Sequence, residues 1–451
     1  MIVVSGRQGA ELWAENPLPI ELIIAEMEKL LPDGKQAVFL CGESLNGELG
    51  RQIMKQLREE GRQAIETRDL SVLEKAEVIV DCLHGCQLDH VLSNEEITLI
   101  ETVNNANAFV LALDVPSGLN SDNGALYGAC IKADVTLTLQ APKTGLYFYP
   151  GSEQAGKIII AGQVNNLTGD MFINNFKDIA EMIPVRKPHS HKGTYGKVLL
   201  IGGGPGMSGA CLLAAKAILR CGAGMLTVMC HEEVWPVIGS NLPEAMTIPF
   251  TEDNYRKIWA QTDLSRYTLI AIGPGLGRTE STEYLLNRVL ATELPCVIDA
   301  DGLFFLQGHQ ELLNRKALTV ITPHAMEYQR IFGFEQAKLI ADLKRESLEY
   351  PNLVIVYKCE HTLIAHQGHI TINTTGNNAM AKGGSGDVLC GLTAAFTAQR
   401  TDEKAVIAAV YLHSLAADQW LESHSSYSLL PSDLIAGVDR ILLTWQKEQK
   451  R

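Results

Sequence analysis

Short apolar runs, each ending near a small or polar residue, recur along the first part of the chain. They have the length of buried strands and lie at 36–41, 78–81, 109–114, 135–139 and 157–161. The stretches 20–31 and 51–61 predict helices beside them. Strands that alternate with helices predict a parallel α/β sheet, whose ligands lie at the carboxyl ends of its strands. We therefore predict an α/β fold that begins with a Rossmann-like parallel-sheet domain.

A second series of apolar runs follows residue 187. Between residues 162 and 187 the alternation fades into a stretch with paired asparagines and a proline, which we interpret as a linker. Buried strands are then predicted at 197–201, 269–272, 296–299, 319–322 and 353–357. Glycine, aspartate, histidine or lysine stands at or just after the end of each. We expect domains at 1–163 and 188–451, with a linker at 164–187.

Composition narrows the class of partner. The net charge of −14 argues against nucleic acid or an anionic membrane surface as the main partner. Ten cysteines stand singly, which suits a reducing compartment. The first residues lack a basic start followed by an apolar core, and the longest apolar region, 198–228, is broken by glycines and charges. We expect a cytoplasmic protein without a membrane span.

Residues 373–389, NTTGNNAMAKGGSGDVL, carry the strongest chemical signal. Glycines at 383, 384 and 386 precede an apolar small-residue run that predicts a helix. Such a loop aims backbone N–H groups at one spot, where the helix dipole also favours an anion such as phosphate. Asp387 falls beside that spot, where a carboxylate would accept a proton from a hydroxyl that attacks the phosphate. The alternative interpretation is an aspartate that only complements the helix dipole.

Other polar residues follow the predicted strands and would meet at one edge of each sheet. Asp81 and Asp114 do so in the first half, and His324 and Lys358 do so in the second half. Each also has a plain structural interpretation, because aspartates form turns, histidines cap helices and lysines are solvated in loops.

The second half, from Ser190 to about Thr444, resembles the carbohydrate-kinase-like domain of NAD(P)H-hydrate dehydratases, a branch of the ribokinase-like superfamily. The segments that carry the resemblance follow one another along the domain: HKGTYGKVLLIGG, GMSGACLLAAKAILRCGAG, GPGLG, TPHAMEY, NTTGNNAMAKGGSGDVL and AVYLHSLAAD. It implies a ribokinase-like α/β fold and removal of water from hydrated NADH and NADPH, at the expense of ADP or, in some members, ATP. Mg²⁺ is expected on the nucleotide phosphates.

The resemblance also implies roles for single residues. Positions for the hydrated dinucleotide fall on Ala210, Gly275, His324 and Asp387, with Asp387 as the catalytic group. Positions for the adenine nucleotide fall on Lys358, Cys359, Glu360, His361, Thr362 and Gly386. The chain departs from the family at Ala325 and Met326, where proline and glycine are usual, and at Asn378 and Ser385.

The first half, from about Ile20 to Gln163, resembles the NAD(P)H-hydrate epimerase that often precedes the dehydratase. The family's Asn-Asn-Gly-Gly-Asp loop is represented by 45–49, LNGEL, and its glycine-threonine-glycine stretch by 85–87, GCQ. The resemblance places potassium on Asn46, Asp81 and Ser117, and substrate on Asp114. Leucines at 45 and 49 remove hydrogen bonds that a dinucleotide would need. We therefore expect little or no epimerisation.

Two alternatives stay open at this point. The second half would also suit a small-molecule kinase for a sugar or vitamin precursor, since the glycine loop and Asp387 would serve equally well there. The first half would also suit a domain kept for assembly or ligand sensing. We expect a homo-oligomer, and the sequence does not decide between ADP and ATP or between the NADH and NADPH forms.

Overall fold

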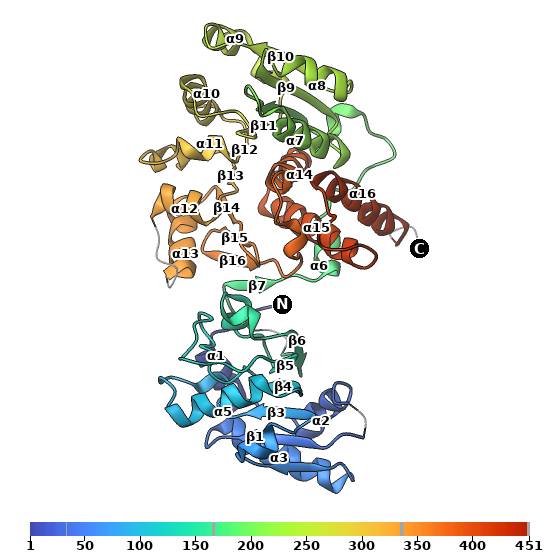
Figure 1. Ribbon diagram of the computed structural model, residues 1–451. Helices are drawn as coiled ribbons and strands as arrows, with labels where there is room; N and C mark the ends of the chain where they lie inside the picture. The colour runs from blue at the N-terminus through green and yellow to red at the C-terminus, as the bar shows by residue number, and fades with distance from the viewer. Residues whose placement is uncertain (33, 165–166, 334–337, 449–451) are drawn as a thin grey trace. The chain divides into compact units, whose positions relative to one another are not determined.

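The computed structural model describes residues 1–32, 34–164, 167–333 and 338–448, and the chain forms two compact units (Figure 1). Unit 1 is Met1–Phe172 and unit 2 is Ile173–Arg451. Among the described residues, no helix has the length and apolar character that a membrane span requires.

Unit 1 is built on a six-stranded parallel sheet in the order β2-β1-β3-β4-β5-β6. Its strands are β1 (Ala37–Cys41), β2 (Ala64–Glu66), β3 (Val78–Cys82), β4 (Phe109–Leu113), β5 (Val135–Leu139) and β6 (Lys157–Ala161). Its helices are α1 (Gly6–Glu15), α2 (Ile20–Glu28), α3 (Leu45–Glu59), α4 (Leu70–Leu73) and α5 (Asn94–Asn105), with 3₁₀ turns η1 (Gly85–Gln87), η2 (Thr144–Tyr147) and η3 (Gly151–Glu153).

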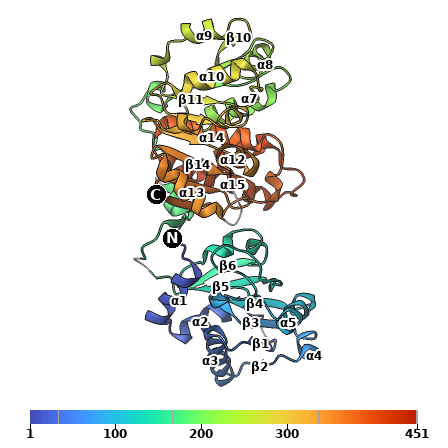
Figure 2. The same cartoon turned by 90° about the vertical axis from the view of Figure 1, so that its left-hand side faces the viewer.

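Helices cover both faces of this sheet. Phe39 of β1 faces α2 and α3 in one apolar cluster, whereas its neighbour Leu40 faces α4 and α5 in another. Figure 2 shows the strands between these two helix layers. Because both faces are buried, the strands read as continuous apolar runs rather than as alternating ones.

Unit 2 is built on a larger sheet in the order β10-β9-β8-β11-β12-β13-β14-β15-β16. The strands from β10 to β14 are parallel, and β15 and β16 are antiparallel to their neighbours. They are β8 (Lys197–Ile201), β9 (Met225–His231), β10 (Met246–Phe250), β11 (Leu269–Ile272), β12 (Cys296–Ile298), β13 (Thr319–Ile321), β14 (Leu353–Tyr357), β15 (Leu363–His366) and β16 (His369–Ile372). A short strand, β7 (Met171–Ile173), lies at the boundary between the units.

The helices of unit 2 are α6 (Phe176–Ala180), α7 (Ser208–Arg220), α8 (Trp235–Asn241), α9 (Tyr255–Gln261), α10 (Glu280–Leu290), α11 (Asp301–Phe304), α12 (Ala325–Phe332), α13 (Leu339–Glu349), α14 (Ser385–Gln399), α15 (Glu403–Leu421) and α16 (Pro431–Glu448). The 3₁₀ turns are η4 (Lys192–Tyr195), η5 (Leu264–Arg266), η6 (Gln310–Leu313) and η8 (Asn378–Met380). Figure 1 shows α10, α12 and α13 on the opposite side of the strands from α14.

Helix α14 is the centre of unit 2. Its residues from Val388 to Thr397 are all buried, among α7, α15, α16 and the sheet. A Cβ at Gly391 would come within 2.4 Å of the Ala214 carbonyl oxygen, so only glycine permits this approach to α7. This packing fixes the N-terminus of α14 beside the carboxyl ends of the strands.

The α/β class and the parallel sheets confirm the sequence-based prediction, but one helix boundary was wrong. Helix α3 begins at Leu45 rather than at residue 51, because the Ser44 hydroxyl accepts a hydrogen bond from the Gly47 N–H at 3.1 Å and caps the helix there. Strands β2, β7, β9, β10, β15 and β16 were not predicted.

The domain limits stay a prediction. The segment expected to be a linker, 164–187, contains the whole of α6, whose Ile179 is fully buried in the core of unit 2. Residues 165–166 lie outside the described residues.

Candidate active site

A cavity of about 990 Å³ opens in unit 2 where strands end and α14 begins. It is lined by residues that follow β12, β13 and β14, by the loop 375–387, and by residues of α15. In open parallel sheets this edge is where ligands bind. The cavity brings together the sequence-predicted residues His324, Lys358, Cys359, Glu360, His361, Thr362, Gly386 and Asp387.

The glycine loop enters α14 as the sequence predicts. Gly384 has a φ of 101°, in the left-handed region that favours glycine, and Ser385 opens the helix. The first-turn N–H groups of a helix lack partners within the helix, so they and the helix dipole favour an anion at this place. Asp387 lies in this first turn.

The pKa of Asp387 is raised toward neutral pH. Burial raises its pKa to about 6, the nearby carboxylates of Asp299 and Asp301 add to the rise, and Lys358 opposes it. A carboxylate with this pKa both holds and releases a proton near neutral pH, which suits a general base.

Lys358 and Asp299 form a partly buried ion pair that lines the cavity. The lysine Nζ lies 2.8 Å from Asp299 Oδ1 and 3.9 Å from Glu327 Oε2. Burial lowers the pKa of Lys358, but the carboxylates of Asp299 and Glu327 outweigh it and raise the pKa above its ordinary value. A Cβ at Gly386 would lie 3.6 Å from the same Nζ, so the lysine's charge stands against the start of α14.

His324 both caps a helix and lines the cavity. Its Nδ1 accepts hydrogen bonds from the backbone N–H groups of Met326 at 3.2 Å and Glu327 at 3.3 Å. The proton of the neutral ring is then on Nε2, which lies 3.5 Å from Glu327 Oε1. The capping interpretation of His324 is therefore correct for Nδ1. The ring is nevertheless half exposed and lines the cavity.

The loop that opens the glycine stretch is tied to α15. Asp418 accepts hydrogen bonds at 2.9 Å from the Gly376 N–H and from the side-chain amide of Asn377. Gly376 has a φ of 110°, which favours glycine at this turn. Asp418 thus fixes one wall of the cavity from a helix that follows in sequence.

Ala210 and Gly275 lie together but are not among the residues that line this cavity. A Cβ at Gly275 would come within 2.6 Å of the Met207 carbonyl oxygen and 3.0 Å of the Ala210 Cβ. The glycine therefore lets the loop after β11 pack on the start of α7. Asp301 supports that loop by accepting a hydrogen bond from the Gly277 N–H at 2.8 Å.

Asp299 and His413 are among the cavity residues to which the sequence analysis assigned no individual role. Asp299 follows β12, and its place at a strand end was a usable signal. His413 lies within α15, and burial lowers its pKa to about 4, so the ring is neutral. Its Nε2 is buried without a hydrogen-bond partner among the described residues.

In unit 1 the residues proposed for potassium are joined by internal hydrogen bonds. The fully buried Asp81 accepts from the Ser117 hydroxyl at 2.6 Å and from the Ser117 N–H at 2.7 Å. The side-chain amide of Asn46 donates to the Leu113 carbonyl oxygen at 3.0 Å. These bonds join the ends of β3 and β4 to α3.

Asp114, the residue proposed for substrate in unit 1, is paired with Lys143. The side chains form a buried ion pair and are 8% and 1% exposed. A cavity of about 30 Å³ adjoins them, and Trp13, Leu45 and Leu49 are among its lining residues. The leucines noted in the sequence therefore stand beside Asp114, where they supply no hydrogen bonds.

Two family models match the chain. The model described as NAD(P)H-hydrate dehydratase matches residues 198–440, and the one described as YjeF-related protein N-terminus matches residues 30–145. Similar proteins include the bifunctional NAD(P)H-hydrate repair enzyme of Coxiella burnetii, which is 35% identical over 89% of this chain and 83% of its own length. The protein of the same name from Vibrio cholerae is 33% identical over 84% of this chain and 77% of its own length.

Solved structures resemble unit 2. The ADP/ATP-dependent NAD(P)H-hydrate dehydratase of Bacillus subtilis, co-crystallised with ATP and Mg²⁺, has a TM-score of 0.53 and 34% identity, and the match covers 60% of this chain and 97% of that one. A ribokinase-like superfamily protein of Enterococcus faecalis has a TM-score of 0.56 and 29% identity, over 63% of this chain and 99% of that one.

Proposed function

The chain belongs to the NAD(P)H-hydrate dehydratase family, and we propose that unit 2 carries out the repair reaction with ADP as the phosphoryl donor. The reaction converts hydrated NADH or NADPH back to the intact cofactor. One observation carries the assignment of the site: a cavity of about 990 Å³ in which a helix N-terminus, Lys358 and an aspartate with a pKa of about 6 face the same space.

The proposed chemistry has two steps. The hydroxyl oxygen of the hydrate attacks the terminal phosphorus of ADP while Asp387 takes the hydroxyl proton. AMP leaves with the electrons of the broken P–O bond. Phosphate then leaves the ring carbon with the C–O electrons and a ring proton is lost, which restores the double bond. The first-turn N–H groups of α14 stabilise the charge on the transferring phosphoryl group.

The nucleotide is proposed to lie along Lys358–Thr362 and Gly386. Support comes from the Lys358 ammonium, which is charged and partly buried and borders the start of α14. An ammonium in this position binds phosphate through a charge-assisted hydrogen bond. The hydrated dinucleotide is proposed to lie along His324 and Asp387, with Ala210 and Gly275 beyond the cavity wall.

Mg²⁺ fits the donor set of this site. Carboxylate oxygens are its preferred protein ligands, and Asp299 and Asp387 stand close enough for one to raise the pKa of the other. A divalent ion bound with the nucleotide would offset that repulsion and neutralise phosphate charge. We propose that Asp299 holds the ion through Oδ2. Its Oδ1 pairs with Lys358, whereas Oδ2 faces the start of α14, 3.9 Å from the Cβ position of Gly386.

The small-molecule kinase alternative is not favoured. The family model for the dehydratase spans nearly all of unit 2, and the similar bifunctional repair enzymes align along both units. The site chemistry alone would suit either reaction, so the family decides between them.

For unit 1 we propose little or no hydrate epimerisation. The supporting observation is that Leu45 and Leu49 line the cavity beside Asp114, at positions where the epimerase family has polar residues. Potassium at Asn46, Asp81 and Ser117 stays a prediction, as do the domain limits and a homo-oligomer.

The direct test is to incubate the purified chain with hydrated NADH and either ADP or ATP and to follow the return of nicotinamide absorbance. We expect recovery that depends on the nucleotide and is faster with ADP. If a folded protein supplied with Mg²⁺ gave no recovery with either ADP or ATP, the assignment would be refuted. Recovery only with ATP would retain the reaction and reverse the choice of donor.

A further inference from the structure

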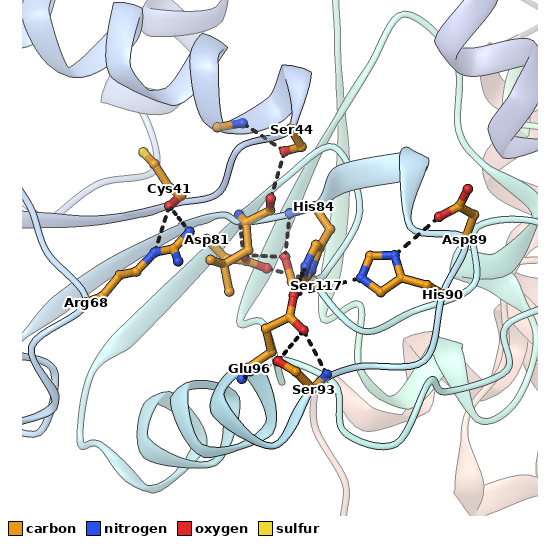
Figure 3. Close-up of polar contacts among 12 residues, drawn as sticks. Cys41, Ser44, Arg68, Asp81, His84, Asp89, His90, Ser93, Glu96 and Ser117 are labelled. Atoms are coloured by element: carbon orange, nitrogen blue, oxygen red, sulfur yellow. Dashed lines mark hydrogen bonds and ion pairs between the residues drawn. The ribbon is translucent and has the colours of Figure 1, made fainter.

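We propose that unit 1 binds a divalent transition-metal ion of the Zn²⁺ class through His84, His90 and Glu96. The three residues offer ligand atoms that all lie within 4.8 Å of one another. Glu96 Oε1 lies 2.9 Å from His84 Nε2 and 4.0 Å from His90 Nε2. Figure 3 shows both rings beside the Glu96 carboxylate.

Neighbouring hydrogen bonds orient two of these residues. The His84 backbone N–H donates to the Ser117 hydroxyl at 3.1 Å, which fixes the turn after β3. The Ser93 N–H and hydroxyl donate to Glu96 Oε2 at 2.8 Å and 2.7 Å, in a capping box at the start of α5. Because Ser93 occupies Oε2, Oε1 is the oxygen turned toward the histidines.

His90 can use Nε2 as a metal ligand because its Nδ1 has a separate partner, Asp89. Nδ1 lies 3.2 Å from Asp89 Oδ1, so the tautomer with its N–H on Nδ1 donates to Asp89 and leaves the Nε2 lone pair for a metal ion. Nε2 then directs its lone pair toward Glu96 Oε1, which also carries lone pairs. Two acceptors that face each other favour a cation between them, and an aspartate behind a histidine is the usual support of a metal ligand.

The ordinary alternative is a histidine–glutamate hydrogen bond without a metal. That bond accounts for His84, whose Nε2 lies at hydrogen-bond distance from Glu96. The second ring packs edge-on against His84, with centroids 6.1 Å apart, but neither that contact nor the bond to Asp89 requires its Nε2 to face the same carboxylate oxygen. His90 is 58% exposed, so its ring has room to close the 4.0 Å gap.

The donor set selects the class of ion. Two imidazole nitrogens and one carboxylate oxygen match the three-ligand zinc sites that keep a fourth position open, with metal–ligand distances of about 2.0–2.2 Å. Mg²⁺ and Ca²⁺ prefer oxygen ligands throughout. All three residues line a cavity of about 460 Å³ at the carboxyl ends of β1 and β3, where the order of the strands reverses and α/β sheets bind ligands.

The test is equilibrium dialysis of the full chain, free of any histidine tag, against Zn²⁺. We expect one saturable site, and at least tenfold weaker binding in His90→Ala and in Glu96→Gln. Glutamine keeps the capping box, so Glu96→Gln retains the start of α5. The control is His309→Ala, which removes an exposed histidine 3.5 Å from Glu311 and should leave Zn²⁺ binding unchanged.

Co²⁺ supplies a second readout, because its visible absorption reports coordination by protein ligands. We expect bands that appear with one equivalent of Co²⁺, vanish on addition of Zn²⁺ and are absent in His90→Ala. Absence of saturable Zn²⁺ binding to the full chain would overturn the proposal. Equal Zn²⁺ affinity in the parent and His90→Ala would overturn it too, since the ion would then be held elsewhere, such as on cysteine.

Discussion

Units 1 and 2 place carboxylates at the same kind of sheet edge but surround them differently. In unit 2, Asp387 and the Lys358–Asp299 pair border a cavity of about 990 Å³. In unit 1, the Asp114–Lys143 pair adjoins a cavity of about 30 Å³ with Leu45 and Leu49 in its wall. The cavity of about 460 Å³ beside it shares His84 and Gln87 with it but is not lined by Asp114. A retained carboxylate is therefore a weak sign of activity, because the groups around it decide whether a dinucleotide can bind there.

Asp387→Asn should give the largest effect on activity. The amide keeps the shape but cannot accept the hydroxyl proton, so turnover should fall by about 10²–10⁴, the range for a positioned acid–base group. Thermal melting at pH 7 should be unchanged or higher, because the buried carboxylate is disfavoured in its charged form. The control, Glu403→Gln, removes a charge from the first turn of α15 and should leave turnover unchanged. Comparable turnover in a folded Asp387→Asn variant would reduce Asp387 to a structural role.

Asp114→Ala should affect stability rather than dehydration. Removing one partner of the buried pair leaves the Lys143 charge without compensation, which lowers the free energy of unfolding by about 3–5 kcal/mol. Calorimetry should show the transition of unit 1 at a lower temperature while dehydratase turnover below that temperature stays at the parent level. The exposed Asp122→Ala is the control. A parallel loss of dehydration would show that the two units depend on each other.

Lys358→Ala should weaken ADP binding more than hydrate binding. A charge-assisted contact of this kind contributes about 1.5–3 kcal/mol, so ADP affinity should fall tenfold or more. Titration calorimetry with each ligand measures the two effects, and alanine at the exposed Lys316 serves as the control. Unchanged ADP affinity in the folded variant would place the nucleotide elsewhere.

The pH profile should show a smaller, graded effect. The pKa of Asp387 is raised to about 6, and the base form is needed, so kcat should level off above that pH and fall toward tenfold per unit below it. The sign for stability is opposite: a carboxyl whose folded pKa lies above the ordinary value stabilises the fold at low pH, and this contribution is lost as pH rises through 6. The melting advantage of Asp387→Asn should therefore shrink between pH 7 and pH 4. A parent profile flat down to pH 4 would contradict the assigned base.

The sequence predicted what depends on neighbours along the chain. The strands that were predicted, the glycine loop and the place of Asp387 in the first turn of α14 follow from local patterns. The Lys358–Asp299 pair did not follow, because it joins residues 59 positions apart across an intervening strand. His413 was missed as a cavity residue because the apolar stretch around it resembles any buried helix. The start of α3 was missed because the Ser44 cap was not considered.

The most direct test of the difference between the units is the extent of repair on a mixture of both stereoisomers of hydrated NADH. The chain is supplied with Mg²⁺ and excess ADP, and absorbance is followed to its plateau. We expect a plateau at the fraction present as the dehydratable stereoisomer, followed only by the slow rise that uncatalysed exchange between the stereoisomers gives. Rapid recovery of the whole mixture, lost in Asp114→Ala while dehydration of the single stereoisomer persists, would instead assign epimerase activity to unit 1.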